Sequence, residues 1–282
     1  MPRRSKRMAV FVAAADESDG PLQKGPFVYG GFIAPFVVWE NVFAPMWEEQ
    51  VLNSDPPIGP FHMTEIRNPK WQALNGLSDA QAQLKIDAAV HVVASIPELR
   101  VAHTRFDGGH FRQTFGASRM MSRGRQPGAH RLEPDYVGFM GFARAALEYV
   151  HDNHPDAERV DFVVERKTTV THYLPQYLEE LVTWAKKENR HALLDLIGEV
   201  IPGAKDRAPL QASDLAMWHI RRHEARESEA VDVLRLAAMF NGRQMILGEI
   251  TNDELTVIHA QAMDLIRARA TDAKREATSG GT

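Results

Sequence analysis

Three acidic residues stand where strongly apolar segments of this chain end or begin. They are Asp16, after the run Met8–Ala15; Glu165, after the run Val160–Val164; and Asp214, near the start of an apolar helix. An isolated carboxylate is costly to bury, so an acid at the tip of a hydrophobic element requires a partner or a metal ion. If the two runs are neighbouring strands and the helix packs beside them, the three acids converge on one site.

The chain as a whole alternates strand-like and helix-like segments. Short apolar runs predict strands at Met8–Ala15, Phe27–Ala34, Leu99–Phe106, Val160–Glu165 and Leu196–Ile201. Helical spacing predicts a helix opening at Pro35 and others at about Asp79–Ser95, Tyr136–Val150, Tyr173–Lys187, Leu210–Arg226, Ala230–Phe240 and Asp253–Arg269. A short connection makes the first two strands an antiparallel hairpin, in which Gly30 and Gly31 permit a neighbour to approach closely. The order predicts an α/β fold with a mixed sheet flanked by helices.

Length and composition set the outer limits. A chain of 282 residues can bury one large core. We expect a main domain over 8–226, a helical extension packed on it over 227–276, and flexible termini at 1–7 and 277–282. The absence of Cys excludes disulfides and thiolate metal sites. No apolar run approaches the roughly 20 residues of a membrane span, and a cytoplasmic location is the default expectation.

Four short motifs together resemble the family of bacterial and phage proteins described as domain of unknown function 3800. They are Asp16-Glu17-Ser18, Gly30-Gly31, Phe61-His62-x-x-Glu65 and Leu210-Gln211-Ala212-Ser213-Asp214-Leu215. The resemblance implies a ribonuclease-H-like fold, in which clustered carboxylates and a divalent metal cleave or transfer phosphodiesters. The chain departs from the family pattern at Asp19, where a Gly is more usual, and at Glu165, where an Asp is more typical.

The residue chemistry suggests a site of the same kind. Mg²⁺ or Mn²⁺ held by Asp16, Glu165 and Asp214 could activate a water and stabilise a leaving oxygen. Glu65 is a candidate fourth ligand with His62 nearby for proton transfer, whereas strand alternation predicts Glu17 on the opposite face, as a turn or hydrogen-bonding residue. Simpler interpretations stay open, because Asp16 could form a turn, Glu165 a strand-end ion pair, and Asp214 a favourable contact with a helix dipole.

A basic stretch forms the second candidate site. Residues 108–132 contain no acid but carry Arg112, Arg119, Arg123, Arg125 and Arg131, with Phe111 and Phe115 interleaved. The glycines and a proline predict a loop that could hold a phosphate backbone and stack on bases, although an ordinary solvated loop is equally compatible. The net charge of −4 argues against a generally basic nucleic-acid binder but permits a local basic patch.

These features leave three functional hypotheses. The first is a metal-dependent nuclease or phosphodiesterase acting on nucleic acid. The second is a non-catalytic nucleic-acid- or protein-binding member of the same fold, in a mobile-element or defence system. The third is a phosphatase for a small phosphate ester, in which the basic stretch serves as a lid.

Overall fold

The computed structural model describes residues 9–17, 25–122, 129–166, 168–240, 243 and 245–279. The strands are β1 (Ala9–Glu17), β2 (Pro26–Pro35), β3 (Arg100–Asp107), β4 (Ala157–Glu165), β5 (Ile197–Gly203) and β6 (Ile246–Glu249). The helices are α1 (Phe36–Val38), α2 (Ala44–Trp47), α3 (Met63–Ile66), α4 (Pro69–Leu74), α5 (Asp79–Ser95), α6 (Gly108–Ser122), α7 (Pro134–Asn153), α8 (Thr168–Lys187), α9 (His191–Leu194), α10 (Ala208–Glu224), α11 (Ala230–Phe240) and α12 (Asn252–Ser279). Turns of π-helix join α1 to α2 and follow α2.

The strands form one six-stranded mixed sheet in the order β5-β4-β1-β2-β3-β6. β2 runs antiparallel to both β1 and β3, whereas β4 and β1, β5 and β4, and β6 and β3 are parallel pairs. β1 is therefore central, with the hairpin partner on one side and a parallel strand on the other. The predicted α/β fold with a mixed sheet flanked by helices is confirmed, and the strand order is consistent with a ribonuclease-H-like arrangement.

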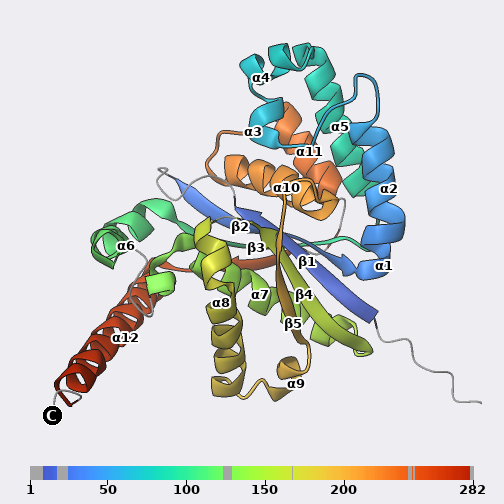
Figure 1. The fold of residues 1–282 in the computed structure, drawn as a ribbon. Coiled ribbons are helices and arrows are strands. Elements are labelled where there is room, and N and C mark those ends of the chain that lie inside the picture. The colour runs from blue at the N-terminus through green and yellow to red at the C-terminus, as the bar shows by residue number, and fades with distance from the viewer. Residues whose placement is uncertain are drawn as a thin grey trace, which may run out of the picture.

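Alternation along the strands divides the core into two layers. Phe11, Ala13 and Ala15 of β1 pack in the layer that contains α7 and α8. Val12 and Ala14 face the opposite layer, which contains α5, α10 and α11. Figure 1 shows these two groups of helices on opposite faces of the sheet. Side chains of a strand alternate between the two faces of the sheet, so in β1 the odd-numbered residues contact one group of helices and the even-numbered residues the other.

Several local predictions agree with the structure. Ser78 caps α5, and its capping box with Gln81 is complete. β1 and β2 form the expected antiparallel hairpin. No helix in the described ranges is long and apolar enough to cross a membrane.

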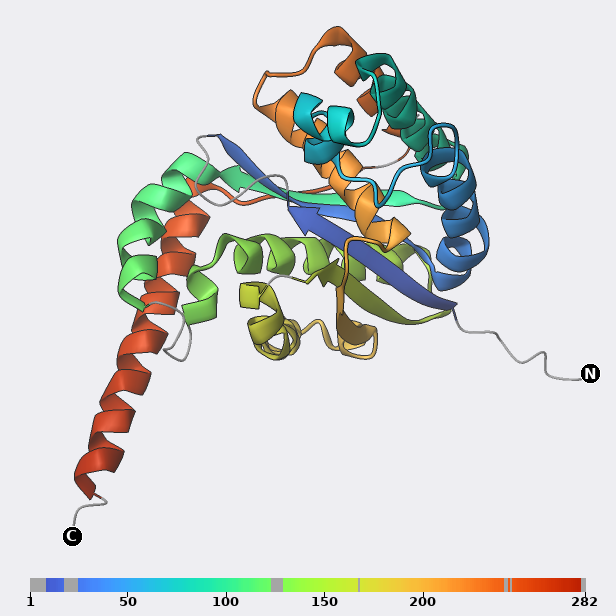
Figure 2. The same cartoon turned by 45° about the horizontal axis from the view of Figure 1, so that its top comes forward.

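Two predictions about the later chain need correction. The helical extension contains a strand, because β6 pairs with β3 at the edge of the main sheet. The terminal helix α12 continues to Ser279, so residues 277–279 are helical, and 280–282, like 1–7, lie outside the described residues. Figure 2 shows α12 extending away from the sheet beyond its contact with α6.

The prediction of a loop over 108–132 is also wrong for its first part. Residues 108–122 form α6, and Ala129–Leu132 form a short 3₁₀ helix. The Asp107 carboxylate accepts hydrogen bonds from the backbone N–H groups of Gly109 (2.7 Å) and His110 (3.0 Å) and so caps the helix. Phe111 and Phe115, four residues apart, are buried and stacked on each other at 4.2 Å between ring centroids. These aromatic rings belong to the core and are not exposed for base stacking.

Candidate metal centre

The candidate site lies at the carboxyl ends of β1 and β4. The two strands are parallel neighbours, and the pairing of Ala15 with Val164 places Asp16 beside Glu165. Asp16 follows Val12 and Ala14 at every second position of β1, so its side chain lies on the same face of the sheet, the face covered by α10. Oxygens of Asp16, Glu17 and Glu165 all lie within 4.8 Å of one another. The predicted meeting of Asp16 and Glu165 is therefore observed.

Glu17 belongs to this three-carboxylate cluster, contrary to the prediction that it points away. Strand alternation does predict the opposite face, but Glu17 is the last residue of β1, where a side chain can turn around the sheet edge. Its backbone N–H donates a hydrogen bond of 2.9 Å to Oδ1 of Asp16, so the two adjacent acids form a compact unit. The Asp-Glu dipeptide at a strand end is the signal in the sequence that could have found it.

The third predicted ligand, Asp214, is carried to the cluster by α10. This helix packs directly on β1 and β2, where Oγ of Ser213 donates a hydrogen bond of 2.9 Å to the backbone oxygen of Ala14. A Cβ added at Gly31 would lie 2.2 Å from that Oγ, so only glycine allows this approach. The predicted role of the glycine pair in close packing is therefore confirmed at Gly31.

Asp214 lies beside the cluster but is not one of its three members. Its Oδ2 accepts a 2.6 Å hydrogen bond from the backbone N–H of Met63. Burial first, and then the charges of Glu165 and Glu65, raise the pKa of Asp214 to about 7, although the Met63 hydrogen bond and the charge of Lys205 oppose the shift. The role of Asp214 as a metal ligand beside Asp16 and Glu165 stays a prediction, and in the described part of the chain the third carboxylate of the group within 4.8 Å is Glu17.

The glutamine of the Leu-Gln-x-x-Asp-Leu motif, Gln211, has a structural role of its own. Oε1 of Gln211 accepts hydrogen bonds from Nε1 of Trp47 (2.8 Å) and from the backbone N–H of Phe61 (2.9 Å). Gln211 and Asp214 therefore hold the segment 61–63 against α10 at two points. The motif fixes the position of His62 and of α3, which carries Glu65.

Lys205 is a basic neighbour of the three-carboxylate cluster. Its Nζ lies 3.1 Å from Oε1 of Glu165 and 2.6 Å from Nε2 of His62. Since an ammonium donates, Nε2 of His62 accepts, and Nδ1 lies 2.8 Å from Oγ1 of Thr64. Burial and then Lys205 lower the pKa of His62, so the ring is neutral at pH 7. Lys205 supplies positive charge beside the carboxylates.

Glu65 and the predicted basic residues are placed less closely. Glu65 is exposed on α3 and is outside the three-carboxylate cluster, although its charge raises the pKa values of Asp214 and His62. Arg112 is half-buried on α6, and Nε of Arg131 donates a 2.8 Å hydrogen bond to Glu180. The predicted contacts of Arg119, Arg123 and Arg125 lie outside the described side chains.

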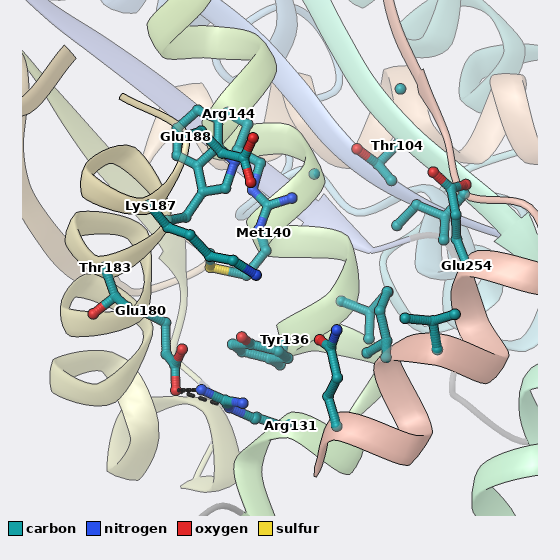
Figure 3. A pocket seen from close by; sticks show the side chains of 18 of the residues that line it. Thr104, Arg131, Tyr136, Met140, Arg144, Glu180, Thr183, Lys187, Glu188 and Glu254 are labelled. Carbon is teal, nitrogen blue, oxygen red and sulfur yellow. Dashed lines mark hydrogen bonds and ion pairs between the residues drawn. The ribbon is translucent and has the colours of Figure 1, made fainter. Parts of the chain in front are cut away.

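A separate cavity of about 730 Å³ lies between α7, α8 and the start of α12 (Figure 3). Its walls include Arg144, Trp184 and Lys187, with the Arg131–Glu180 pair at one side. The guanidinium carbon of Arg144 lies 4.8 Å from the centre of the Trp184 ring. None of the carboxylates of the candidate metal centre lines this cavity, which belongs to the α7–α8 layer.

Comparison with known proteins adds no relative. No protein-family model, no curated protein and no solved structure matches the chain.

Proposed function

We propose that this chain is a metal-dependent phosphodiesterase whose substrate class is nucleic acid. The observation that carries the proposal is the approach of the Asp16, Glu17 and Glu165 oxygens to within 4.8 Å of one another. Mg²⁺ and Mn²⁺ prefer oxygen ligands and are commonly held by a few carboxylates plus a substrate phosphate. This donor set fits either ion. The strand order and the motif resemblance to the domain of unknown function 3800 family support the same class.

The roles follow from the positions of the side chains. Asp16, Glu17 and Glu165 would hold the ion, which when bound would polarise a phosphate oxygen and acidify a water. Lys205 would oppose the negative charge of the phosphate, since its Nζ already lies 3.1 Å from Glu165. Neutral His62 would accept a proton at Nε2 once Lys205, which now donates to that nitrogen, contacts the phosphate instead. Asp214 would hold α3 in place through Met63 and add negative charge near the ion.

The test combines binding with chemistry. The protein is first freed of metal with EDTA, and the EDTA is then removed. Addition of millimolar Mg²⁺ or Mn²⁺ should raise the temperature of unfolding, because the ion binds the folded state preferentially. The protein should then hydrolyse labelled oligonucleotides and the small diester bis(4-nitrophenyl) phosphate. Asp16→Asn should remove the metal-dependent thermal shift and lower the rate of hydrolysis by more than about 100-fold. Loss of a residue that only supports a metal ligand typically lowers activity by about 10- to 100-fold, so a larger loss would indicate a ligand.

The control variant is Asp264→Asn, whose carboxylate is exposed on α12 and is 3.5 Å from Arg267. It should leave the metal response and hydrolysis unchanged. A wild-type protein with neither a metal-dependent shift nor diester hydrolysis would contradict the proposal. Hydrolysis of 4-nitrophenyl phosphate without hydrolysis of either diester would favour the phosphatase hypothesis instead.

One observation favours a second candidate, a non-catalytic binding protein of the same fold. Lys205 contacts both Glu165 and His62, and Asp214 accepts from Met63, so these polar groups also stabilise the fold. A nucleic-acid-binding protein that shows no metal-dependent hydrolysis would support this candidate.

A further inference from the structure

One helical turn beyond Asp214, α10 carries an indole covered by two guanidinium groups. Trp218 follows Asp214 by four residues, so both side chains lie on the same side of the helix. The guanidinium carbons of Arg67 and Arg222 lie 5.0 Å and 4.8 Å from the centre of the Trp218 ring. Both distances are within the range of a favourable cation–π contact. We call these three residues the Arg67–Trp218–Arg222 surface.

A buried carboxylate also holds this surface in place. Oδ1 of Asp232 lies 3.9 Å from Nη1 of Arg67, and Oδ2 lies 3.6 Å from Nε of Arg222. These contacts are longer than hydrogen bonds, so Asp232 attracts both guanidinium groups by charge, while Nη2 of Arg222 donates a hydrogen bond to the backbone oxygen of Glu227. The Asp232 side chain is fully buried, whereas those of Arg67 and Arg222 keep 22% and 20% of their exposure.

The local charge is positive. Arg235 is a third arginine near Asp232, with Nη1 at 3.8 Å from Oδ1, and its Nε also bonds Asp87 at 2.7 Å. Asp87 therefore offsets Arg235, and the single charge of Asp232 is shared by Arg67 and Arg222. One arginine would have been enough to pair a buried carboxylate. The second leaves one positive charge in excess at a half-buried, rigid position.

The surface is aligned with the candidate metal centre. Met63 contacts Asp214, and Arg67 follows Met63 by four residues, so α3 and α10 advance together from the carboxylates to the arginines. Four helical residues rise about 6 Å. A stacked strand rises about 3.4 Å per nucleotide, so the arginines lie about two nucleotides from Asp214.

We propose that the Arg67–Trp218–Arg222 surface binds the phosphate backbone of a nucleic-acid strand whose next segment lies at the carboxylate cluster. Arg67 and Arg222 contact the phosphates, and Trp218 and Asp232 position the two guanidinium groups. The proposal deepens the proposed function, because it names how the same site would bind its substrate. It assigns this binding to α3 and α10 and not to the stretch 108–132.

The experiment measures binding separately from cleavage. Fluorescence anisotropy of labelled single-stranded DNA and RNA oligonucleotides is followed in EDTA over a series of salt concentrations. Arg67→Gln and Arg222→Gln should each weaken binding several-fold and flatten the slope of log affinity against log salt by about 0.7. The double variant should flatten it by about 1.4. Arg67→Lys and Arg222→Lys, which keep the charge, should restore most of the slope.

Arg144→Gln is the matched control, because Arg144 of α7 lies over Trp184 of α8 at 4.8 Å, in the layer on the other face of the sheet from α10. It removes the same charge from the same kind of contact and should leave binding unchanged. Equal effects of Arg67→Gln, Arg222→Gln and Arg144→Gln, or a wild-type protein that binds neither probe at low salt, would overturn the proposal. Either result leaves the metal-dependent hydrolysis of bis(4-nitrophenyl) phosphate as an independent measure of the proposed function.

Circular dichroism and thermal unfolding verify that each variant is folded before its affinity is compared. If Arg67→Gln does not fold, Arg222→Gln and the two lysine variants carry the same comparison. Binding that is lost equally in the lysine and glutamine variants would indicate a structural role for the arginines and would overturn the proposal.

Discussion

Two regions along α10 differ in the sign of the charge that they gather. Near its start, Asp214 lies beside three clustered carboxylates, with Lys205 as the contacting base. Near its end, His219 and Arg222 of α10 lie beside a carboxylate of the neighbouring helix α11, Asp232, and the Nδ1 of His219 lies 3.8 Å from Oδ1 of that carboxylate. Arg67 and Arg235 approach the same carboxylate from outside α10. Negative charge therefore gathers near Asp214 and positive charge near Arg222, about two turns apart along α10.

The difference predicts which end should respond to a metal ion. Arginine is always charged, so the carboxylate of Asp232 has permanent partners within the chain. Carboxylates held close together repel one another, and a divalent cation is the kind of partner that relieves this repulsion. The acidic end should therefore respond to metal, whereas the arginine end should respond only to changes in its own residues.

The largest expected effect is the loss of Asp232. Asp232→Asn leaves buried guanidinium groups without their common counter-charge and should destabilise the protein by about 3–5 kcal/mol, with or without metal. Asp16→Asn removes one of three repelling charges and should leave stability in EDTA unchanged or raised. Urea unfolding of both variants in EDTA and in Mn²⁺ measures this contrast. Equal losses of stability in EDTA would show that the two ends do not differ as described.

An intermediate effect should follow from disturbing the packing of α10. Gly31→Ala places a Cβ 2.2 Å from Oγ of Ser213, so α10 must shift away from the strands. We expect a loss of about 1–3 kcal/mol and a smaller metal-induced thermal shift, because Asp214 moves from the carboxylates. Gly59→Ala is the control, since a Cβ there meets nothing within 4 Å. A normal metal response in Gly31→Ala would mean that the position of α10 does not matter to the cluster.

The smallest effect is an opposite pH dependence of Asp214 and of two buried histidines, His219 of α10 and His103 of β3. Burial raises the pKa of Asp214 to about 7 and lowers those of His219 and His103 to about 4. Between pH 4 and 7 the folded state keeps a proton on Asp214 that the unfolded state has lost, so this group stabilises the fold as pH falls. The histidines act with the opposite sign, since between pH 6.5 and 4 the unfolded state takes up protons that the folded state refuses.

Asp214→Asn should therefore expose the histidine contribution. Its stability should fall more steeply than that of the wild type on acidification from pH 6.5 to 4, by about 1.4 kcal/mol per pH unit. Asn keeps an oxygen to accept from Met63, so the packing is preserved. Urea unfolding in EDTA at several pH values gives the two slopes. Parallel slopes would contradict the raised pKa of Asp214.

Much of the fold was predictable because its signals are local. The apolar runs gave the first five strands, and Ser78 with Gln81 marked the start of α5. The helix α6 was missed because the glycines and the proline of the stretch 108–132 suggested a loop, although Asp107 caps the first turn and Phe111 and Phe115 have helical spacing. β6 has only four residues and is defined by its pairing with β3, so the local sequence does not predict it.

The candidate site divides in the same way. Asp16 and Glu165 were predictable because an acid that ends an apolar strand lies at the sheet edge, and parallel neighbours bring such edges together. Lys205 lies between Glu165 and His62 only because residues 61–63 are held on α10 by Gln211 and Asp214. The hydrogen bonds of Gln211 with Phe61 and of Asp214 with Met63 join residues 150 and 151 positions apart in the sequence, so no local pattern predicts them.

The sequence by itself determined that acids end two buried strands and that another sits in an apolar helix, because burial and charge act on each segment separately. Only the tertiary structure decided that Glu17 joins Asp16 and Glu165, that Asp214 lies beside them, and that Arg67 and Arg222 meet over Trp218, one turn beyond Asp214. Which side chains meet depends on strand register and on the close contact of α10 with Gly31. Register and packing are set by the whole core at once, so no single segment contains them.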